Sequence, residues 1–203
     1  WVEKYRPDDM CKIILEDYNK YLIFNMLEKK LYPNLLLYGP PGTGKTTTII
    51  NIINKIYPNE LNKSIVLHLN ASDERGIDMI RNQIQKFISS KPLFNDKIKF
   101  IILDEVDYMT KSAQIALKYL LQQYNTSNLI FYLMCNYISK IDESLKSEFI
   151  ELKFYKTPKN KILDFMLHIV KCENIKINEE SIIKIIDYFD CDIRSMINYM
   201  QLN

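Results

Sequence analysis

Glycine is scarce in this sequence, because only four of its 203 residues are glycines. Three of them, Gly39, Gly42 and Gly44, stand close together in one short stretch. Glycine adopts positive φ angles at little cost and lets other groups approach the main chain closely. The freedom to form an unusual backbone is therefore concentrated in this stretch, and we expect chemistry there.

Cysteine is also sparse, and its pattern argues against the common disulfide and metal scaffolds. The sequence has four cysteines, none of them in a C-x-x-C pair, and we find no metal-ligand spacing with His68 or His168. The cysteines are Cys11, Cys135, Cys172 and Cys191. We expect reduced, packed thiols of an intracellular protein.

Long apolar runs are missing as well. No run approaches the roughly 18 residues that cross a bilayer, and the first residues include Glu3, Lys4 and Arg6 instead of a signal-peptide pattern. We therefore expect a soluble protein without a membrane partner. The 27 basic and 25 acidic residues nearly cancel, which leaves a net charge of +2. This balance does not identify a nucleic-acid-binding protein, so any contact with DNA depends on where single charges lie.

Short apolar runs alternate with longer helical patterns through most of the chain. The apolar runs cover residues 35–38, 65–69, 100–103, 129–134 and 150–154. The helical patterns between them cover residues 45–56, 77–89 and 111–124. This alternation predicts the α/β fold class, with a doubly wound parallel sheet covered by helices.

The pattern changes after Thr157 and Pro158, where three helical patterns follow one another without a strand. They cover residues 159–172, 179–189 and 193–200. We therefore predict two domains, an α/β domain over residues 1–155 and a small helical domain over residues 156–203.

The glycine-rich stretch fits a phosphate-binding loop. Residues 39–46 match G-x-x-x-x-G-K-[ST] and lie between a predicted strand and a predicted helix. In such a loop the backbone N–H groups and the positive end of the helix face the phosphates, while Lys45 reaches the β and γ oxygens and Thr46 binds Mg²⁺. The motif thus predicts ATP and Mg²⁺ as cofactors. The alternative is a glycine-rich turn without a ligand.

Polar side chains follow two of the predicted strands. Asp104 and Glu105 come directly after the run 100–103, at the end where an open parallel sheet presents its ligand crevice. We predict that Asp104 holds Mg²⁺ and that Glu105 polarises the attacking water as a base. Asn136 follows the next run and should lie beside them, where it can orient water or touch the γ-phosphate. The alternatives are a surface loop that begins at Asp104 and an ordinary turn residue at Asn136.

Two boxes are more specific than the phosphate loop. Residues 1–7 are Trp-Val-Glu-Lys-Tyr-Arg-Pro, and residues 70–78 are Asn-Ala-Ser-Asp-Glu-Arg-Gly-Ile-Asp. With Asp-Glu-Val-Asp at 104–107 and the following Met-Thr, they resemble the small subunits of replication factor C, the sliding-clamp loader of the AAA+ superfamily. From residues alone, 1–7 would be an ordinary extended segment.

The resemblance implies roles for residues that the loop pattern leaves unassigned. Residues of the first box lie beside ATP in relatives, which implies that Val2 and Arg6 contact the nucleotide. Asn136 and Arg194 match the two sensor positions of the family and are expected to act in catalysis with Glu105. Taken alone, Arg194 would be a solvated residue near the start of a helix. The full set of expected nucleotide contacts is Val2, Arg6, Gly39, Pro40, Pro41, Gly42, Thr43, Gly44, Lys45, Thr46, Thr47, Asn136 and Arg194.

Contact with DNA is implied by the resemblance and supported by modest chemistry. In clamp loaders the box at 70–78 leads into a helix that follows the template strand. We expect contacts from Gly76, Ile77, Arg81, Thr110 and Lys111, with helix starts that offer free N–H groups to phosphates. Such contacts carry no sequence specificity. The alternative is that these cations form a solvated face.

Three departures from the family pattern stand out. Relatives carry Ser-Arg-Cys ahead of the fifth strand, where the arginine is a finger that enters the neighbouring subunit's ATP site. Here residues 147–149 are Ser-Glu-Phe, so Glu148 replaces the finger, and nearby Lys146 is expected to point elsewhere. Lysine and tyrosine occupy positions 118–119, where relatives have two arginines on the helix that couples DNA to the site. Cys191 replaces a glycine that commonly precedes the sensor arginine.

The resemblance implies an ATPase subunit that helps to open a sliding clamp and load it on primer–template DNA during replication and repair, active within the assembled complex. The implied partners are the other replication factor C subunits of a heteropentamer, the clamp and DNA. The implied location is the nucleus in a eukaryote, and otherwise the cytoplasm. The C-terminal collar of the family is expected to be absent from this chain. Two alternatives remain: an ATP-binding scaffold subunit with little hydrolysis and no arginine finger, and a small-molecule or nucleotide kinase.

Overall fold

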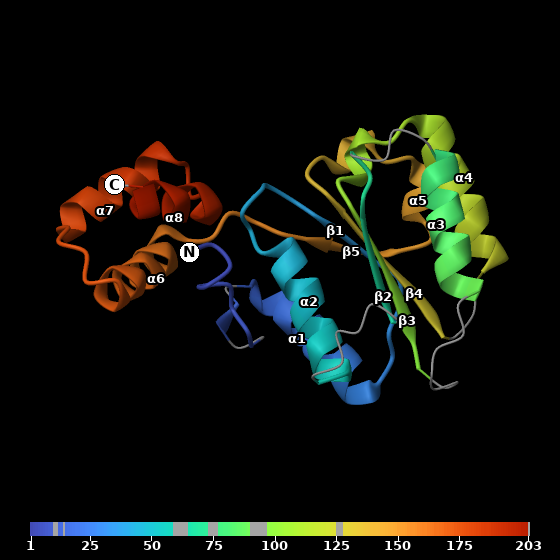
Figure 1. Cartoon of the computed structure of the whole chain (residues 1–203), viewed down its shortest axis with the longest axis horizontal. Helices are drawn as coiled ribbons and strands as arrows, with labels where there is room; N and C mark the ends of the chain where they lie inside the picture. Colours follow the sequence, from blue (N-terminus) through green and yellow to red (C-terminus); the bar gives the residue numbers. More distant parts are fainter. Residues whose placement is uncertain are drawn as a thin grey trace.

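The computed structural model describes residues 1–9, 12–13, 15–58, 65–72, 77–89, 97–124 and 128–202, without the side chains of residues 77–79. A central sheet and its helices form the larger part, and a group of three helices lies beside it (Figure 1). The chain therefore has the layered organisation that the alternating pattern predicts.

The sheet contains five parallel strands in the order β2-β3-β4-β1-β5. The strands are β1 (Leu35–Tyr38), β2 (Val66–Asn70), β3 (Lys99–Asp104), β4 (Leu129–Cys135) and β5 (Ile150–Lys153). All five match predicted apolar runs within one or two residues. Because β4 lies between β1 and β3, the ends of the strands before the phosphate loop, the two carboxylates and Asn136 are neighbours.

Helices cover both faces of the sheet (Figure 1). On one face lie α1 (Asp17–Lys29) and α2 (Lys45–Ile56), and on the other lie α3 (Ile77–Ser89), α4 (Lys111–Gln123) and α5 (Glu143–Lys146). Short 3-10 turns, η2 (Val106–Tyr108) and η3 (Ile138–Lys140), follow β3 and β4. Apolar side chains of alternating orientation on the strands supply two cores, one for each helix layer. The doubly wound α/β fold class is confirmed.

The sequence patterns did not predict α1. Its buried apolar residues, such as Ile23 and Met26, are interspersed with exposed Tyr18, Tyr21 and Phe24, so no one-sided apolar stripe marks it. Glu16 at its N-cap also makes no side-chain capping bond. Packing of the buried residues against the sheet core decides this helix.

Three further helices form what we call the lid: α6 (Lys159–Cys172), α7 (Glu179–Tyr188) and α8 (Ile193–Leu202). Isoleucine and methionine side chains from all three build a separate core. The N-terminal segment, residues 1–7, packs against this core through Trp1, Val2 and Tyr5. At its other end, the Pro7 carbonyl accepts a hydrogen bond of 2.9 Å from Asn51 Nδ2 on α2. The segment therefore joins the lid to the α/β layers.

The expectation of packed thiols is wrong for Cys172, which is exposed on α6, whereas Cys135 is buried. Cys172 Sγ lies 3.6 Å from Nε2 of His168 one turn earlier, a spacing that the sequence analysis passed over. The described part of the chain, which excludes Cys11, contains no group of three or more potential metal ligands. Within the same residues, no helix is both long and apolar enough to span a membrane.

Tyr132 presents an unpaired hydroxyl in the core between α2 and the sheet. Its side chain is fully buried against Phe100, and its hydroxyl has no hydrogen-bond partner among the described residues. Burial raises the pKa of this phenol. A buried polar group without a partner costs free energy, so the hydroxyl destabilises the fold.

Replacing Tyr132 with phenylalanine is expected to raise the free energy of unfolding by about 1 kcal/mol, because the penalty for the unpaired hydroxyl disappears. Tyr57→Phe is the matched control, since its hydroxyl accepts a 2.9 Å hydrogen bond from the Ile98 N–H. That variant should lose about 1 kcal/mol. Urea unfolding followed by circular dichroism measures both changes, and a loss of stability in Tyr132→Phe would contradict the assignment.

Candidate functional site

The phosphate loop connects β1 to α2 and requires glycine at two positions. A Cβ atom on Gly39, whose φ is 145°, would lie 2.1 Å from the Phe154 carbonyl oxygen. At Gly42, where φ is 72°, a Cβ atom would lie 2.3 Å from Oδ1 of Asp192 at the start of α8. Both contacts are shorter than packing allows, so the loop sits directly against β5 on one side and the lid on the other.

Lys45 is the first residue of α2 and is only 9% exposed. Its ammonium donates to the carbonyl oxygens of Gly39 (2.7 Å) and Pro40 (2.9 Å) and to Oδ1 of Asn136 (3.0 Å). Burial lowers the pKa of Lys45, and the nearby Asp104 carboxylate opposes this decrease. A buried cation held mainly by neutral dipoles favours an anionic ligand.

Asp104 ends β3 beside the start of α2. Thr46 Oγ1 lies 3.4 Å from Asp104 Oδ2, so a hydroxyl and a carboxylate face each other next to the loop. Oxygen ligands of this kind suit Mg²⁺, and the pair fits the expected metal role. Asp104 Oδ1 also accepts a 2.8 Å hydrogen bond from the N–H of Glu105, which adopts a left-handed conformation with φ of 56°. Both carboxylates line one cavity.

That cavity has a volume of about 210 Å³ and lies between the phosphate loop, the N-terminal segment and the lid. It brings together most of the expected site residues from distant parts of the sequence. Those that line it are Val2, Arg6, Pro41, Gly42, Thr43, Gly44, Lys45, Thr46, Thr47, Asp104, Glu105, Asn136 and Arg194. Gly39 and Pro40 do not line it, and their carbonyl groups hold Lys45 from behind.

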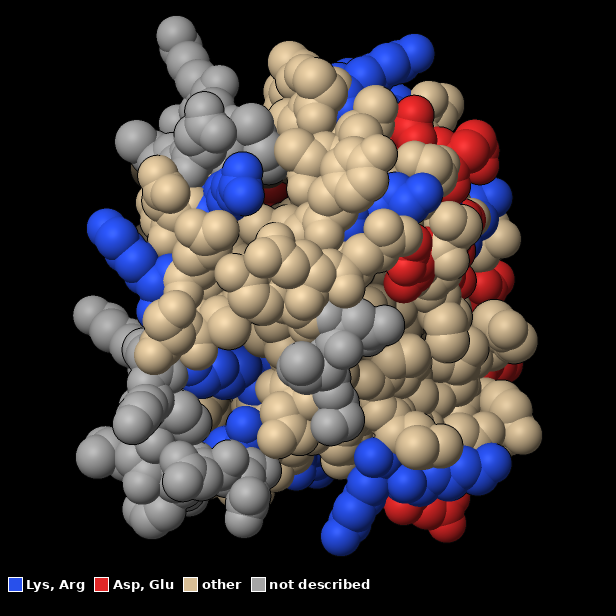
Figure 2. Space-filling view, turned by 90° about the vertical axis from the view of Figure 1, so that its right-hand side faces the viewer, with Lys and Arg blue, Asp and Glu red and all other residues tan. Residues whose placement is uncertain are grey.

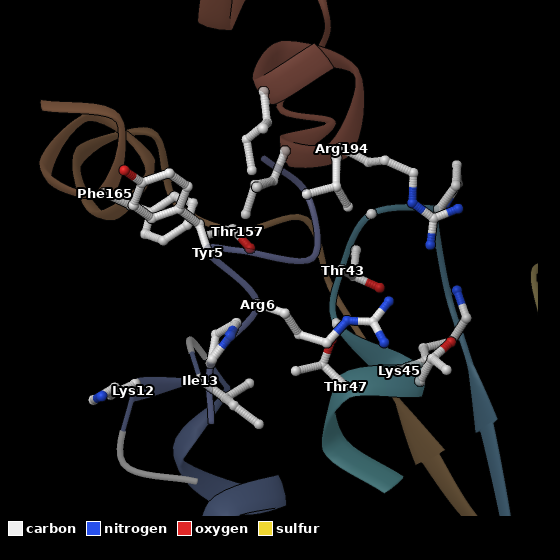
Figure 3. Close-up of a pocket in the computed structure, with 18 of the residues that line it drawn as sticks. Tyr5, Arg6, Lys12, Ile13, Thr43, Lys45, Thr47, Thr157, Phe165 and Arg194 are labelled. Atoms are coloured by element: carbon white, nitrogen blue, oxygen red, sulfur yellow. The ribbon is translucent and has the colours of Figure 1, made fainter. Parts of the chain in front are cut away.

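Cationic groups enter the cavity from three elements (Figure 3). Arg6 extends from the N-terminal segment and Arg194 from α8, and both point toward the phosphate loop that carries Lys45. Burial lowers the pKa of Lys45, and the positive charge of Arg194 adds to this decrease. Asp104 and Glu105 line the same cavity, and Glu3 forms a 2.7 Å ion pair with Arg6. Because the Lys45 ammonium is buried and held by neutral dipoles, the part of the cavity beside the phosphate loop is suited to an anionic ligand.

The sequence analysis missed the apolar end of the cavity. This end is formed by side chains of the N-terminal segment, the loop before α1 and two lid helices: Tyr5, Ile13, Phe165, Ile193 and Ile197. An apolar recess next to a phosphate loop can take a planar base. Nothing in the local sequence distinguishes these residues from other core positions, because they come together only when the lid packs.

The N-terminal segment is fastened to the lid by polar contacts. The Tyr5 hydroxyl and the Lys4 ammonium each donate to Glu173 Oε1 at 2.5 Å, just after the end of α6. These hydrogen bonds lower the pKa of Glu173. The Tyr5 ring also meets His168 edge to face. One wall of the cavity is therefore attached to the lid.

The described side chains expected to contact DNA, those of Arg81, Thr110 and Lys111, lie on α3 and at the start of α4, and none of them lines the cavity. Arg81 and Lys111 are exposed, whereas Gly76 and the side chain of Ile77 lie outside the described residues. Thr110 caps α4, where its hydroxyl accepts a 3.3 Å hydrogen bond from the Ala113 N–H. That donor of α4 is therefore satisfied internally. On the α3–α4 side, Asp and Glu gather mainly in the right-hand part of Figure 2, whereas Lys and Arg also occupy other parts.

Glu148 follows α5 and is held by α4. Its Oε1 accepts a 2.8 Å hydrogen bond from Gln122 Nε2. The Lys146 side chain is only 12% exposed and forms an ion pair of 2.7 Å with Glu143, whose side chain is 89% exposed. The Lys146 ammonium is therefore engaged by a carboxylate of its own short helix.

Comparisons with known proteins agree with this geometry. The pattern of the "ATPase family associated with various cellular activities (AAA)" matches residues 35–156. Replication factor C subunit 5 of Mus musculus and the replication factor C small subunit of Sulfolobus acidocaldarius are each 38% identical to this chain over 99% of its length. Replication factor C subunit 3 of Saccharomyces cerevisiae is 36% identical over 99%. The chain spans 59%, 61% and 58% of these relatives, respectively.

The fold also has a relative among solved structures. A RuvB variant of Thermotoga maritima superposes with a TM-score of 0.67, covering 98% of this chain and 72% of that one at 14% identity. At this identity the likeness concerns the fold alone. The family pattern, the relatives and the shared architecture lead to one conclusion: the chain belongs to the AAA ATPase family and is similar to replication factor C small subunits along nearly its whole length.

Proposed function

We propose that this chain is the ATP-binding and ATP-hydrolysing part of a sliding-clamp loader subunit, which helps to open a clamp and load it on primer–template DNA in replication and repair. The observation that carries the proposal is the cavity in which the phosphate loop, two carboxylates, Asn136 and Arg194 meet. The named relatives support a clamp loader and, with it, other replication factor C subunits and a clamp as partners. In a eukaryote the place of action is the nucleus.

The proposed chemistry divides the work among residues that the sheet brings together. ATP phosphates bind the loop N–H groups, and Lys45 exchanges its carbonyl partners for phosphate oxygens. Thr46 and Asp104 would hold Mg²⁺, which would neutralise negative charge on the phosphates. Glu105 polarises the attacking water, and Asn136 orients it near the γ-phosphate.

The position of the lid links nucleotide binding to the conformation of the subunit. The apolar end of the cavity takes the base, so ATP spans the lid, the N-terminal segment and the phosphate loop. Arg194 on α8 approaches the γ-phosphate, which makes the closed arrangement more favourable with ATP than with ADP. The nucleotide thereby shifts the population of lid positions.

Lys45 and Glu105 are expected to fail in different ways. Lys45→Ala should weaken ATP binding by roughly 30-fold or more, because it removes a buried charge partner. Glu105→Gln should keep ATP affinity and lower turnover by about 10² to 10⁴, because only the base is lost. Nucleotide titration of the full-length subunit and ATPase assays of the assembled complex measure the two effects. Equal loss of binding in both variants would contradict the division of roles.

The proposed DNA contact involves the outer ends of α3 and α4. Arg81 and Lys111 are exposed there, and their charges can pair with phosphates without reading bases. Tyr119 on α4 is 67% exposed at a position where relatives carry arginine, so this subunit offers less charge on that helix. The contact is therefore expected to be modest and independent of sequence.

Neutralising Arg81 and Lys111 together is expected to weaken binding of the assembled loader to primed DNA and to reduce the slope of log K against log salt by about 0.9 for each lost phosphate contact. The control replaces Lys171 and Lys184, two exposed lid lysines, with the same loss of charge. Binding isotherms at several salt concentrations give the slopes. If both double variants have the wild-type slope, Arg81 and Lys111 are solvated residues.

A second feature of the proposed subunit is that the surface expected to face the neighbouring subunit's ATP site lacks an arginine finger. Glu148 stands where relatives place a cation, and its carboxylate is bonded to Gln122 rather than presented as a positive group. Lys146 does not substitute, because its side chain is enclosed and paired with Glu143. The subunit thus receives a finger without donating one. The missing finger also belongs to the alternative of an ATP-binding scaffold subunit with little hydrolysis, but the intact Glu105 argues against loss of hydrolysis at the subunit's own site.

Glu148→Arg is expected to raise DNA-stimulated ATP turnover at the neighbouring site of the reconstituted loader, by up to about 10³- to 10⁵-fold if that site is otherwise competent. Glu180→Arg, the same charge reversal at an exposed position on α7 of the lid, is the control and should have no such effect. Full turnover at the adjoining site with wild-type Glu148, abolished by Lys146→Ala, would identify Lys146 as the donor instead.

A further inference from the structure

Asp107 is a buried carboxylate that the proposed chemistry does not use. It is 5% exposed and is the middle residue of η2, the turn that follows Glu105. Its Oδ2 accepts a 3.3 Å hydrogen bond from the N–H of Tyr137. Its Oδ1 is shielded from solvent and has no hydrogen-bond partner in the described part of the chain. A buried carboxylate with a free oxygen destabilises a fold, so packing alone does not account for it.

The hydrogen bond that Asp107 accepts lies just beyond the point where β3 and β4 stop pairing. The last paired residues of β3 and β4 are Leu103 and Leu133. Beyond these residues, the segment after β3 forms the left-handed turn at Glu105, and the segment after β4 enters the loop that begins with Asn136. The hydrogen bond from Tyr137 to Asp107 joins these two segments after the ladder has ended. It therefore sets the separation of Asn136 from Glu105.

The same loop is tied to the phosphate loop from its other side. Asn136 Oδ1 accepts from Lys45, and the N–H that reaches Asp107 belongs to the next peptide group. The Asp107 carboxylate opposes the lowering of the Lys45 pKa. Burial raises the pKa of the Cys135 thiol to about 12, and Asp107 contributes to that increase. Its charge thus acts on Lys45, which contacts Asn136, and on Cys135, which precedes Asn136.

We propose that Asp107 is a positioning residue that holds Asn136 where it distinguishes ATP from ADP, an inference that rests on the proposed nucleotide site. When ATP binds, its phosphates attract the Lys45 ammonium. Asn136 therefore loses its hydrogen bond to Lys45 at the point where its amide has to contact the γ-phosphate. The hydrogen bond to Asp107 does not involve the nucleotide and persists. Asp107 thereby keeps the loop that contains Asn136 in a fixed position relative to Glu105 while Lys45 exchanges its hydrogen-bond partners.

The test compares affinities of the full-length subunit for fluorescent ATPγS and fluorescent ADP. Asp107→Leu, which has similar size and no acceptor, is expected to lower ATPγS affinity about fivefold or more, the range of a coupling between sites. ADP affinity should stay within about twofold. Asp107→Asn keeps an acceptor for the Tyr137 N–H and should restore the preference for ATPγS. Asp142→Leu is the matched control, because Asp142 also accepts a backbone N–H, that of Ser144, outside this path.

Asn136→Ala supplies the second arm of the experiment. If Asp107 acts through Asn136, the double variant Asp107→Leu/Asn136→Ala should be no weaker for ATPγS than Asn136→Ala alone. Additive losses, equal losses for both nucleotides, or an Asp107→Asn variant as defective as Asp107→Leu would each overturn the proposal. If Asp107→Leu does not fold, Asp107→Ala, which also lacks an acceptor, takes its place with the same expected ratios. Nucleotide binding by the wild-type subunit tests the proposed function separately, and a failure there removes both.

Discussion

The buried ammonium of Lys45 is the interaction on which the site depends. Three groups from two parts of the fold accept its hydrogen bonds: the carbonyl oxygens of Gly39 and Pro40, and the amide oxygen of Asn136. It therefore joins the loop after β1 to the end of β4. A buried cation costs free energy unless it is compensated, and uncharged dipoles compensate it only in part. An anionic ligand completes the compensation, so the same ammonium that holds the site together also favours occupancy by phosphate.

The cavity depends on contacts among the phosphate loop, the lid and the N-terminal segment, and not on the phosphate loop alone. The loop touches the lid where Gly42 meets Asp192, and Asp192 in turn accepts from the N–H of Arg194 at 3.0 Å. The N-terminal segment crosses between the layers, bound to the lid through Glu173 and to α2 through Asn51. A motion of the lid therefore moves Arg194 together with the apolar cavity side chains of the lid helices and of the N-terminal segment.

The two sides of the proposed subunit are not equivalent. One side presents a cavity with a complete set of phosphate-binding groups, metal-binding oxygens and a base. The other presents Glu148, held by Gln122, where a neighbour's site would require a cation. Because a carboxylate cannot stabilise negative charge on a transferring phosphate, charge alone separates the receiving side from the donating side.

Local sequence was sufficient for the features that depend on neighbouring residues. The pattern of Gly39, Gly42 and Gly44 before Lys45 predicts the strand, loop and helix that the structure contains, because positive φ angles and a helix N-terminus are local requirements. The same holds for Asp104 and Asn136, since the carboxyl ends of parallel strands meet at one edge. Helix α1 escaped prediction because its apolar residues do not share one face.

Only tertiary structure decided which distant groups meet. Glu173 lies 168 residues after Tyr5, yet the two form a hydrogen bond, and no periodicity predicts it. Asp107 belongs to the box at 104–107, but no local pattern predicts its burial, which follows from the way β3 and β4 end side by side. Local patterns determine strands, turns and helix starts through backbone sterics, whereas the partners of a buried charge are chosen by packing across the whole chain.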